Sequence, residues 1–333
     1  MEFRRLGDSG LEVSTLCLGT MTFGDRTDAA EAQRIVGAAF AAGVNFIDTA
    51  DVYTKGASER IVGSAIKAKR RHWILATKVG NAMTTKPHDG GLSRRWIHEA
   101  CNDSLARLGT ECIDIYYLHK DDPDTPLAET VGAIGDLIRS GKVRYFGVSN
   151  YRGWRIAEVV AECEAQGVPR PIVCQPYYNL LNRMPEVEIL PACDYYGLGV
   201  APYSPIARGV LTGKYRGGNK PEDSRAGVND QRILETEFRA ESLAIAEKLE
   251  THAKKTRRTA TQFALAWLWA NRIISSVIAG PRTLAQWAQY LDAIGTSWHD
   301  EDEALVDSLV QPGHPSTPGY SDPQYPFFGR RLE

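Results

Sequence analysis

The sequence VNFIDTADVY, residues 44–53, joins a mainly apolar run to a group of polar side chains. The run covers residues 44–47, and Asp48, Asp51 and Tyr53 follow it directly. Apolar and β-branched residues that end in acid and phenol predict a buried strand that delivers side chains into a site. The alternative is a strand that merely ends in a capping Asp before a helix. The same pattern returns along the chain with a different polar residue each time, which favours a site.

Strand-like and helix-like segments alternate eight times after a small hairpin, which is predicted for residues 3–14. The predicted strands are residues 15–18, 44–47, 73–77, 113–118, 143–148, 171–174, 198–202 and 274–279. The segments with helical spacing are residues 29–42, 58–69, 93–108, 127–140, 153–166, 185–195, 238–254, 259–271 and 283–294. The predicted N-caps are Asp28, Ser58, Ser93 and Thr283.

Eight βα units with nearly continuous apolar strands predict an α/β fold in which a parallel sheet closes into a (β/α)8 TIM barrel. A chain of 333 residues could hold two domains, but barrels of this length are single domains, so we expect one domain over residues 1–333. A doubly wound open sheet is the competing architecture. It requires a glycine-rich phosphate loop after an early strand, and the sequence contains no GxGxxG.

Three segments interrupt the alternation of strands and helices. Residues 80–92 form a long loop after the third strand, residues 207–236 a longer one after the seventh, and residues 311–333 a tail rich in Pro, Gly and aromatic residues. Loops of this length in a compact domain are typical of functional lids or disordered segments. The first two follow strand C-termini, so we expect them at the face where barrels place their active sites.

Composition and charge argue against several functions. The chain carries 39 Lys and Arg against 41 Asp and Glu, its pI is about 6.4, and no basic run indicates binding to nucleic acid or to an anionic membrane. The charged N-terminus does not resemble a signal peptide and no window reaches the length of a membrane span, so we expect a cytoplasmic protein. The six cysteines show no CxxC or zinc spacing, which predicts free thiols and no metal site.

Seven of the eight predicted strands end in a side chain that can donate, accept or titrate. Because strand C-termini converge on one face of a closed barrel, these side chains should share one site. Any one of them could be a solvated or loop-capping residue, but the convergence of acid, phenol, ammonium and imidazole predicts function. The residues at the strand ends are Gly19-Thr20, Asp48, Lys78, His119, Ser149-Asn150, Gln175, Tyr203-Ser204 and Gly280.

These groups together can protonate an oxygen as negative charge develops on it. A free tyrosine has a pKa of about 10, which makes it a poor acid near neutrality. A lysine ammonium beside the phenol stabilises phenolate and lowers its pKa, and an aspartate keeps that lysine charged and oriented. A nearby histidine can hydrogen-bond to a carbonyl oxygen. The site lacks the second acid pair of a glycosidase and the His/Cys cluster of a metal centre.

Nearly the whole chain resembles the aldo-keto reductase superfamily. It is most similar to bacterial members close to the potassium-channel β subunits. The resemblance implies a (β/α)8 barrel that binds a nicotinamide cofactor without a Rossmann fold and acts on a small-molecule aldehyde or ketone. The similar motifs are LCLGTMTFG, NFIDTADVY with SERIVG, LATKVG, IDIYYLH, GKVRYFGVSN, CQPYYNLLNR, YSPIARGVLTGKY and IAGPRTLAQ.

The resemblance places the family's catalytic tetrad on Asp48, Tyr53, Lys78 and His119. Tyr53 would be the general acid in carbonyl reduction, Lys78 paired with Asp48 would tune it, and His119 would orient the substrate carbonyl. The expected cofactor is NADPH rather than NADH, because Arg282 at the start of a helix offers a donor fork to the 2′-phosphate.

The resemblance also implies a set of cofactor contacts. The nicotinamide carboxamide would be held by Ser149, Asn150 and Gln175, with Tyr203 stacking on the ring, and Gly19, Thr20 and Asp48 would be further cofactor contacts. The pyrophosphate segment would be Ser204, Ile206, Arg208, Gly209, Leu211 and Lys214, and residues 207–236 would be the flap that closes over the cofactor. The adenosine-phosphate segment would be Gly280, Arg282 and Gln286.

Two residues depart from the family pattern. Tyr290 stands where many members have an Asn that contacts adenine, and Ala207 replaces a common Gly. The resemblance does not name the substrate, because loop side chains would line its pocket. Our candidates for that lining are Phe23, Tyr151 and the tail aromatics Tyr325, Phe327 and Phe328.

Three functions fit the sequence, and a homo-oligomer is compatible with each. The first is a reductase that moves hydride between NADPH and a carbonyl compound. The second is a cofactor-binding regulatory subunit whose redox state a partner reads, although the chain starts at the barrel without an extension for such a partner. The third is a Schiff-base lyase that uses Lys78, and the nearby acid and phenol argue against it because they favour a charged lysine.

Overall fold

The computed structural model describes residues 1–326. Contacts divide the chain into two compact units. The first comprises residues 1–176, 188–203 and 272–291, and the second comprises residues 177–187, residues 204–271 and the chain from residue 292 onward. The strands found among the described residues all belong to the first unit. All six cysteines are free thiols, and each is buried except Cys112, which is half-buried.

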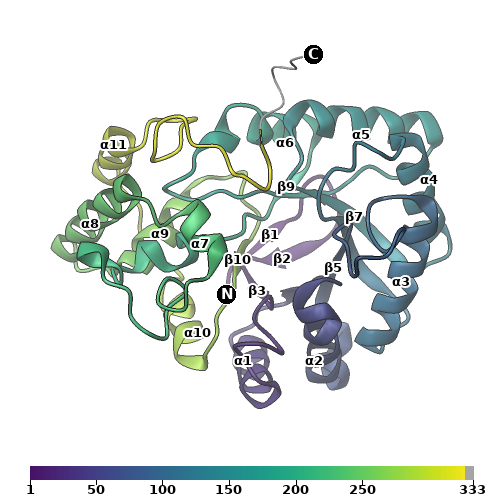
Figure 1. Ribbon diagram of the computed structural model, residues 1–333, viewed down its shortest axis with the longest axis horizontal. Coiled ribbons are helices and arrows are strands. Elements are labelled where there is room, and N and C mark those ends of the chain that lie inside the picture. The colour runs from purple at the N-terminus through teal and green to yellow at the C-terminus, as the bar shows by residue number, and fades with distance from the viewer. Residues whose placement is uncertain (327–333) are drawn as a thin grey trace. The chain divides into compact units, whose positions relative to one another are not determined.

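The first unit is built on an eight-stranded parallel sheet (Figure 1). Parallel bridges from Val200 to Ile274 and from Tyr203 to Ile278 join the two ends of the sheet, so it closes into the predicted (β/α)8 barrel. The strands follow the order β10, β3, β4, β5, β6, β7, β8, β9 around the barrel. They are β3 (Leu16–Gly19), β4 (Phe46–Asp48), β5 (Ile74–Val79), β6 (Ile113–Leu118), β7 (Val143–Ser149), β8 (Val173–Gln175), β9 (Gly199–Val200) and β10 (Val277–Ala279).

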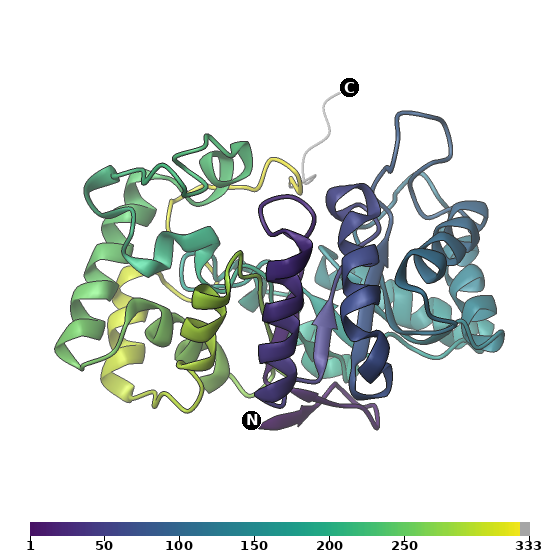
Figure 2. The ribbon, with the colours of Figure 1, turned by 90° about the horizontal axis from the view of Figure 1, so that it is seen from below.

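The predicted hairpin precedes the barrel as β1 (Phe3–Arg5) and β2 (Glu12–Ser14). Figure 2 shows it in purple at one end of the barrel. Leu6 and Val13 of this segment are fully buried in one cluster with strand residues such as Cys17 and Phe46. The hairpin therefore packs on the N-terminal ends of the strands, and the polar strand ends lie at the opposite end.

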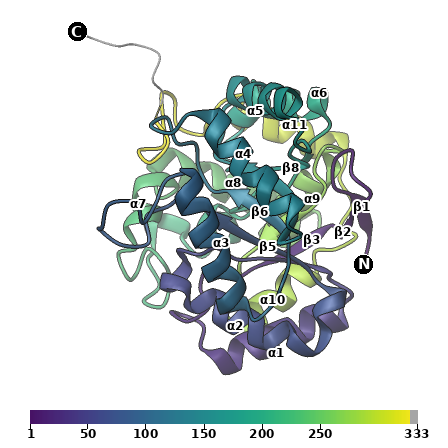
Figure 3. The same cartoon turned by 90° about the vertical axis from the view of Figure 1, so that its right-hand side faces the viewer.

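Helices lie outside the sheet between successive strands. Helix α4 illustrates why: Val131, Ile134 and Leu137 are buried at spacings of three, which gives one apolar stripe. Figure 3 shows helices α3 and α4 side by side on the outside of the sheet. The helices of the first unit are α1 (Ala29–Ala41), α2 (Ala57–Ile66), α3 (Arg94–Leu108), α4 (Leu127–Arg139), α5 (Gly153–Gln166), α6 (Ile189–Tyr196) and α10 (Leu284–Leu291).

Three of the four predicted N-caps are confirmed. The side chains of Asp28, Ser93 and Thr283 each accept a hydrogen bond from the backbone N–H three residues further on. Ser58 is not an N-cap, so that prediction was wrong. Helix α2 begins one residue before it, after Gly56, whose φ of +84° lies in the left-handed region.

The second unit is helical. Its helices are α7 (Gln231–Thr236), α8 (Ala240–Lys255), α9 (Ala260–Ala270) and α11 (Asp300–Leu309), and its short 3-10 turns are η3 (Met184–Glu186), η4 (Ala207–Thr212) and η5 (Arg216–Gly218). None of the helices among residues 1–326 combines the length and the apolar character that crossing a membrane requires.

Several helix boundaries differ from the predictions. Segment 207–236, expected as a loop, contains η4, η5 and α7. The helix expected over residues 185–195 is split into η3 and α6, because Glu188 between them has a non-helical φ of −139°. Helix α11 was not predicted at all. Its first turn consists of four acids, which suit a helix N-terminus. The apolar residues that follow are too few to give a helical period in the sequence.

Candidate active site

Tyr53 and Asp48 belong to one short segment. Strand β4 ends at Asp48, and the chain then turns into a 3-10 turn that begins at Tyr53. Thr54 and Lys55 in this turn have φ angles of +48° and +51°, which residues other than glycine rarely adopt. Strained backbone of this kind is concentrated at functional sites. The turn brings the Tyr53 phenol back to the C-terminal end of the sheet.

Lys78 links the acid and the phenol. Its Nζ donates to Oδ1 of Asp48 at 2.5 Å, to the carbonyl oxygen of Thr49 at 2.8 Å and to the phenolic oxygen of Tyr53 at 3.1 Å. The lysine is fully buried and the aspartate side chain is 2% exposed. Because an ammonium group has three donors, these contacts fix its position completely.

The ion pair keeps the lysine charged. Burial alone would lower the pKa of Lys78, but the Asp48 carboxylate and the Tyr53 oxygen outweigh burial and raise it. Burial raises the pKa of the Tyr53 phenol, and the Lys78 ammonium opposes this rise. As predicted, Lys78 lowers the pKa of Tyr53, but burial has the larger effect and the pKa stays above its ordinary value. The phenol is therefore protonated near neutrality.

His119 lies beside the phenol, directly after β6. The two ring centroids are 5.9 Å apart, and the rings meet edge to face at 80°. Burial, together with the charges of Lys78 and Lys120, lowers the pKa of His119 well below its usual value. Its Nδ1 is buried and has no hydrogen-bond partner among residues 1–326. The imidazole is thus neutral and able to hydrogen-bond to an oxygen that enters the site.

Two amide side chains connect the neighbouring strand ends. Asn150 donates to the carbonyl oxygen of His119 at 2.9 Å and accepts from the Tyr203 hydroxyl at 2.9 Å. Gln175 donates to Oδ2 of Asp48 at 3.0 Å and accepts, through its backbone carbonyl, from the Ser149 hydroxyl at 2.8 Å. These residues were expected together, but nothing in the sequence indicates the contact of Gln175 with Asp48.

The first strand contributes Gly19 and Thr20 to the same end of the barrel. Gly19 pairs in register with Asp48, and the Thr20 hydroxyl donates to the carbonyl oxygen of Asp48 at 3.0 Å. A Cβ at Gly19 would lie 2.8 Å from Cγ2 of Ile278, so the position requires glycine. The nearest group to a Cβ at Gly280 is the carbonyl oxygen of Gly19, at 3.8 Å.

Arg282 and Gln286 lie together at the start of α10. The backbone N–H of Arg282 donates to Oε1 of Gln286 at 2.9 Å, and its carbonyl accepts from the Thr27 hydroxyl at 2.9 Å. The backbone N–H of Leu284 donates to a carboxylate oxygen of Glu31 at 2.6 Å. This helix start thus already holds one anionic group. Tyr290, further along α10, is 5% exposed, with its ring centroid 6.3 Å from that of Trp287.

The segment predicted to hold pyrophosphate lies in the second unit. Ser204, Ala207 and Arg208 have φ angles of +56°, +47° and +50°, and Gly209 has +99°. Backbone that alternates between right- and left-handed conformations forms concave turns whose N–H groups can bind anions. A Cβ at Gly209 would lie 2.5 Å from Nζ of Lys214, so the ammonium group sits directly against this turn.

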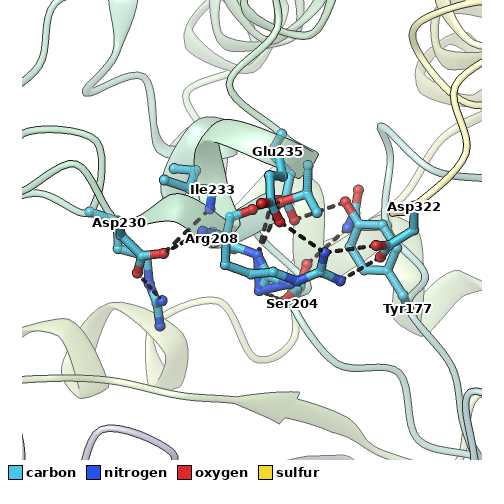
Figure 4. A network of polar contacts seen from close by, with 12 residues as sticks. Tyr177, Ser204, Arg208, Asp230, Ile233, Glu235 and Asp322 are labelled. Carbon is cyan, nitrogen blue, oxygen red and sulfur yellow. Dashed lines mark hydrogen bonds and ion pairs between the residues drawn. The ribbon is translucent and has the colours of Figure 1, made fainter. Parts of the chain in front are cut away.

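Arg208 lies in a network of polar contacts together with Tyr177 and Ser204 (Figure 4). Its Nε lies 3.0 Å from a carboxylate oxygen of Glu237, and both side chains are buried in the second unit. The other Glu237 oxygen accepts from the Tyr177 hydroxyl at 2.8 Å, and Arg208 also donates to the Ser204 hydroxyl at 3.3 Å. Glu237 was not predicted as a site residue, because an acid between two charged segments gives no pattern that would single it out.

The aromatic residues proposed to line a substrate pocket have different positions. Phe23 and Tyr151 are almost completely buried in the first unit. Tyr325 lies in the second unit, with its ring centroid 6.0 Å from the Arg232 guanidinium. Phe327 and Phe328 are outside the described residues. The assignment of these residues to a pocket stays a prediction.

Known proteins match this chain over most of its length. The profile described as "Aldo/keto reductase family" matches residues 15–311. A probable voltage-gated potassium channel subunit beta of Oryza sativa is 38% identical, over 84% of this chain and 87% of the relative. An uncharacterized oxidoreductase, YrpG, of Bacillus subtilis is 36% identical over 97% of this chain and 99% of its own. An L-glyceraldehyde 3-phosphate reductase of Escherichia coli is 31% identical over 94% and 93%. With its closed barrel and the matched profile, the chain belongs to the aldo/keto reductase family.

Proposed function

We propose that this protein is an NADPH-dependent reductase of aldehydes or ketones that also oxidises the corresponding alcohols. The observation that carries the proposal is the contact of buried Lys78 with both Asp48 and Tyr53. Membership of the aldo/keto reductase family supports it, as do relatives whose names describe an oxidoreductase and a reductase. The charged state of Lys78 argues against a Schiff-base lyase, since that chemistry needs a neutral amine.

The four residues have separate tasks in this proposal. A bound nicotinamide supplies the hydride. Tyr53 transfers its proton to the carbonyl oxygen as negative charge develops there, and Lys78 stabilises the phenolate that remains. Asp48 holds the lysine charged and oriented. Neutral His119 hydrogen-bonds to the same carbonyl oxygen and so positions it for the proton transfer.

The residues assigned to the cofactor have suitable chemistry. Ser149, Asn150 and Gln175 offer hydroxyl and amide groups that match a carboxamide. Within the second unit, the turn at residues 204–209 and the ammonium of Lys214 would bind the pyrophosphate. These assignments rest on the family resemblance and on the donor types present.

The enzyme is tested by initial-rate measurements on a panel of aldehydes and ketones with NADPH. Tyr53→Phe should lose about two orders of magnitude or more in kcat, while cofactor affinity stays nearly unchanged. Tyr116→Phe is the matched control, because the Tyr116 hydroxyl is buried without a partner among residues 1–326. Turnover of Tyr53→Phe close to that of the parent would refute the assignment of Tyr53 as proton donor.

The preference for NADPH is assigned to Arg282. A guanidinium keeps its charge at working pH and matches phosphate oxygens, and the 2′-phosphate alone distinguishes the two cofactors. Arg282→Ala should weaken NADPH about ten- to a hundredfold and leave NADH nearly unchanged, as measured by quenching of protein fluorescence. Equal affinity of the parent for both cofactors, or equal weakening of both by the substitution, would exclude this role.

A second function is a regulatory subunit that reports its cofactor's redox state to a partner. The observation that favours it is the printed description of the Oryza sativa relative as a probable potassium channel subunit. This role would share the cofactor site with the enzyme. It is distinguished by the panel above: a regulatory subunit should bind NADPH but turn over every carbonyl compound very slowly.

A further inference from the structure

Asp51 is a buried acid that the proposed reaction does not use. It lies in the segment between β4 and Tyr53, and its side chain is fully buried. Oδ1 accepts a hydrogen bond from the backbone N–H of Val52 at 2.6 Å. Oδ2 is buried as well and has no hydrogen-bond partner among residues 1–326. A carboxylate oxygen that is buried without a hydrogen-bond donor is costly to keep ionised.

The neighbouring acid, Glu59 of α2, accepts hydrogen bonds from two side chains. Its carboxylate accepts from the Thr77 hydroxyl at 2.6 Å and from Nε of Arg107 at 2.5 Å, and its side chain is fully buried. The negative charge of Glu59 is thus well compensated. Asp51 lies near Glu59, but neither Thr77 nor Arg107 donates a hydrogen bond to its carboxylate.

Asp51 is also close to the catalytic lysine. Its backbone N–H is 3.4 Å from the carbonyl oxygen of Lys78. The titratable and charged groups that face it are Glu59 from α2, Arg107 from α3, Lys78 from β5, Tyr116 from β6 and Tyr53 from the adjoining turn. Successive side chains of β5 point to opposite faces of the sheet. Thr77 therefore contacts Glu59 of α2, whereas its neighbour Lys78 contacts Asp48 and Tyr53.

We propose that Asp51 tunes proton donation by Tyr53: when its buried carboxyl ionises, the added negative charge makes the phenol hold its proton more tightly. Asp51 would be a positioning residue: its charge would change the electrostatic potential at Lys78 and Tyr53 without contact with the substrate. The inference rests on the proposed function, because it concerns the acid strength of the group assigned as proton donor.

The electrostatics give the pH at which this effect should appear. Burial and the charge of Glu59 raise the pKa of Asp51 to about 7, while the Val52 N–H, Arg107 and Lys78 oppose the rise. The Asp51 carboxylate in turn raises the pKa of Tyr53. A weaker acid donates its proton more slowly, so carbonyl reduction should slow as Asp51 ionises.

The test is the pH profile of kcat/KM for carbonyl reduction by the full-length enzyme. The wild type should fall about threefold between two plateaus, with a midpoint near pH 7. Asp51→Asn cannot ionise, so it should keep the faster plateau and show no step. Asp114→Asn is the matched control, because Asp114 is a buried acid near the other end of β6, paired with Arg70 and Arg144. This control should retain the step.

Either a step that survives in Asp51→Asn or a flat wild-type profile overturns the proposal. His119 does not contribute to a step near pH 7, because its pKa lies well below its ordinary value. A deuterium isotope effect from labelled NADPH, measured at each pH, separates titration from a change of the slow step. A step that is lost in Asp114→Asn too would also overturn the proposal, since any buried acid would then suffice.

A second measurement needs no turnover. In full-length protein labelled with carbon-13 at the Asp carboxyl and the Tyr ring carbon that bears the hydroxyl, the Asp51 resonance should titrate near pH 7. The Tyr53 resonance should shift with the same midpoint. A midpoint for Asp51 near pH 4, or a Tyr53 resonance that ignores it, refutes the tuning. If no carbonyl compound is reduced, the proposed function fails, while this titration still decides the inference.

Discussion

Each residue of the tetrad depends on its neighbours for its protonation state. Lys78 is buried, and a buried lysine alone would lose its proton. Asp48 prevents this, and Gln175 holds the second oxygen of that carboxylate. Breaking a buried pair on one side leaves an uncompensated charge, which costs roughly 3–5 kcal/mol. Asp48 and Lys78 should therefore behave as one unit.

Substitutions at these two residues should not be additive. Lys78→Met should be nearly inactive, because Tyr53 loses the charge that stabilises phenolate. Asp48→Asn should be impaired less, since the lysine remains but is poorly held. The double mutant should be no worse than Lys78→Met in kcat/KM, because the lysine that Asp48 positions is already gone. A double-mutant loss equal to the product of the two single losses would contradict this coupling.

The residue types at the strand ends could be predicted from the sequence, because strand termini follow directly from the apolar runs. Their hydrogen bonds could not. Gln175 was expected near the cofactor, yet it also donates to Asp48, from which it is separated by more than a hundred positions. Glu237 gave no signal, although it is the acid that pairs with Arg208. Gln175 ends β8 and Asp48 ends β4, so their contact follows from the closed barrel, whereas Glu237 lies between α7 and α8, outside any periodic pattern.

Among the elements, helix α7 lies in the proposed flap and is joined to the C-terminal tail by an ion pair. The Arg232 guanidinium of α7 donates two hydrogen bonds to the Asp322 carboxylate, at 2.7 Å and 2.5 Å. Figure 4 shows Asp322 beside the network around Arg208 and Tyr177. Asp230 caps the same helix at its N-terminus. A bidentate ion pair thus ties segment 207–236 to the C-terminal tail within the second unit.

Removing this ion pair should loosen the proposed flap. Asp322→Asn and Arg232→Gln should each speed NADPH release about three- to tenfold, since a partly exposed bidentate pair contributes on the order of 1 kcal/mol. Stopped-flow fluorescence measures the rate. The exchanged pair, Arg232→Asp with Asp322→Arg, should restore most of the slow release. Arg139→Gln, at an exposed ion pair on α4, is the control and should leave the rate unchanged. Unchanged release in both single variants would argue against a tether.

Strands and helices with a clear hydrophobic pattern could be predicted from the sequence, and helices without one could not. All eight barrel strands were located to within a few residues, because each is a short apolar run next to a helix-forming segment. Helix α7 was missed because it has only six residues. Helix α11 was missed because its first turn consists of acids and only Val306 and Asp302 are buried in it. Local contacts rather than periodicity define such helices.

For the molecule as a whole, the closed barrel explains why the grouping of Asp48, Tyr53, Lys78 and His119 could be predicted. Parallel strands that return on themselves put all their C-termini at one end, so residues far apart in sequence become neighbours. The same burial that organises these residues shifts their pKa values. Folding stability must then depend on pH, because the folded and unfolded chains bind different numbers of protons.

His119 and Asp51 should act on stability in opposite directions. The folded pKa of His119 is depressed, so its contribution to stability is present above about pH 6.5 and is lost as the pH falls below that value. The folded pKa of Asp51 is raised, so its contribution is present below its unfolded pKa of about 3.9 and is lost as the pH rises to about 7.

The stability of Asp51→Asn relative to wild type should therefore change across a defined pH window. An Asn side chain keeps the acceptor for the Val52 N–H and carries no charge at any pH. The variant should gain on the order of 2–4 kcal/mol relative to wild type between about pH 4 and 7, and the difference should be constant above that range. Urea denaturation at several pH values measures it. His119→Gln should show its own gain only as the pH falls below about 6.5. A difference for Asp51→Asn that stays flat from pH 4 to 7 would mean that Asp51 ionises normally in the folded protein.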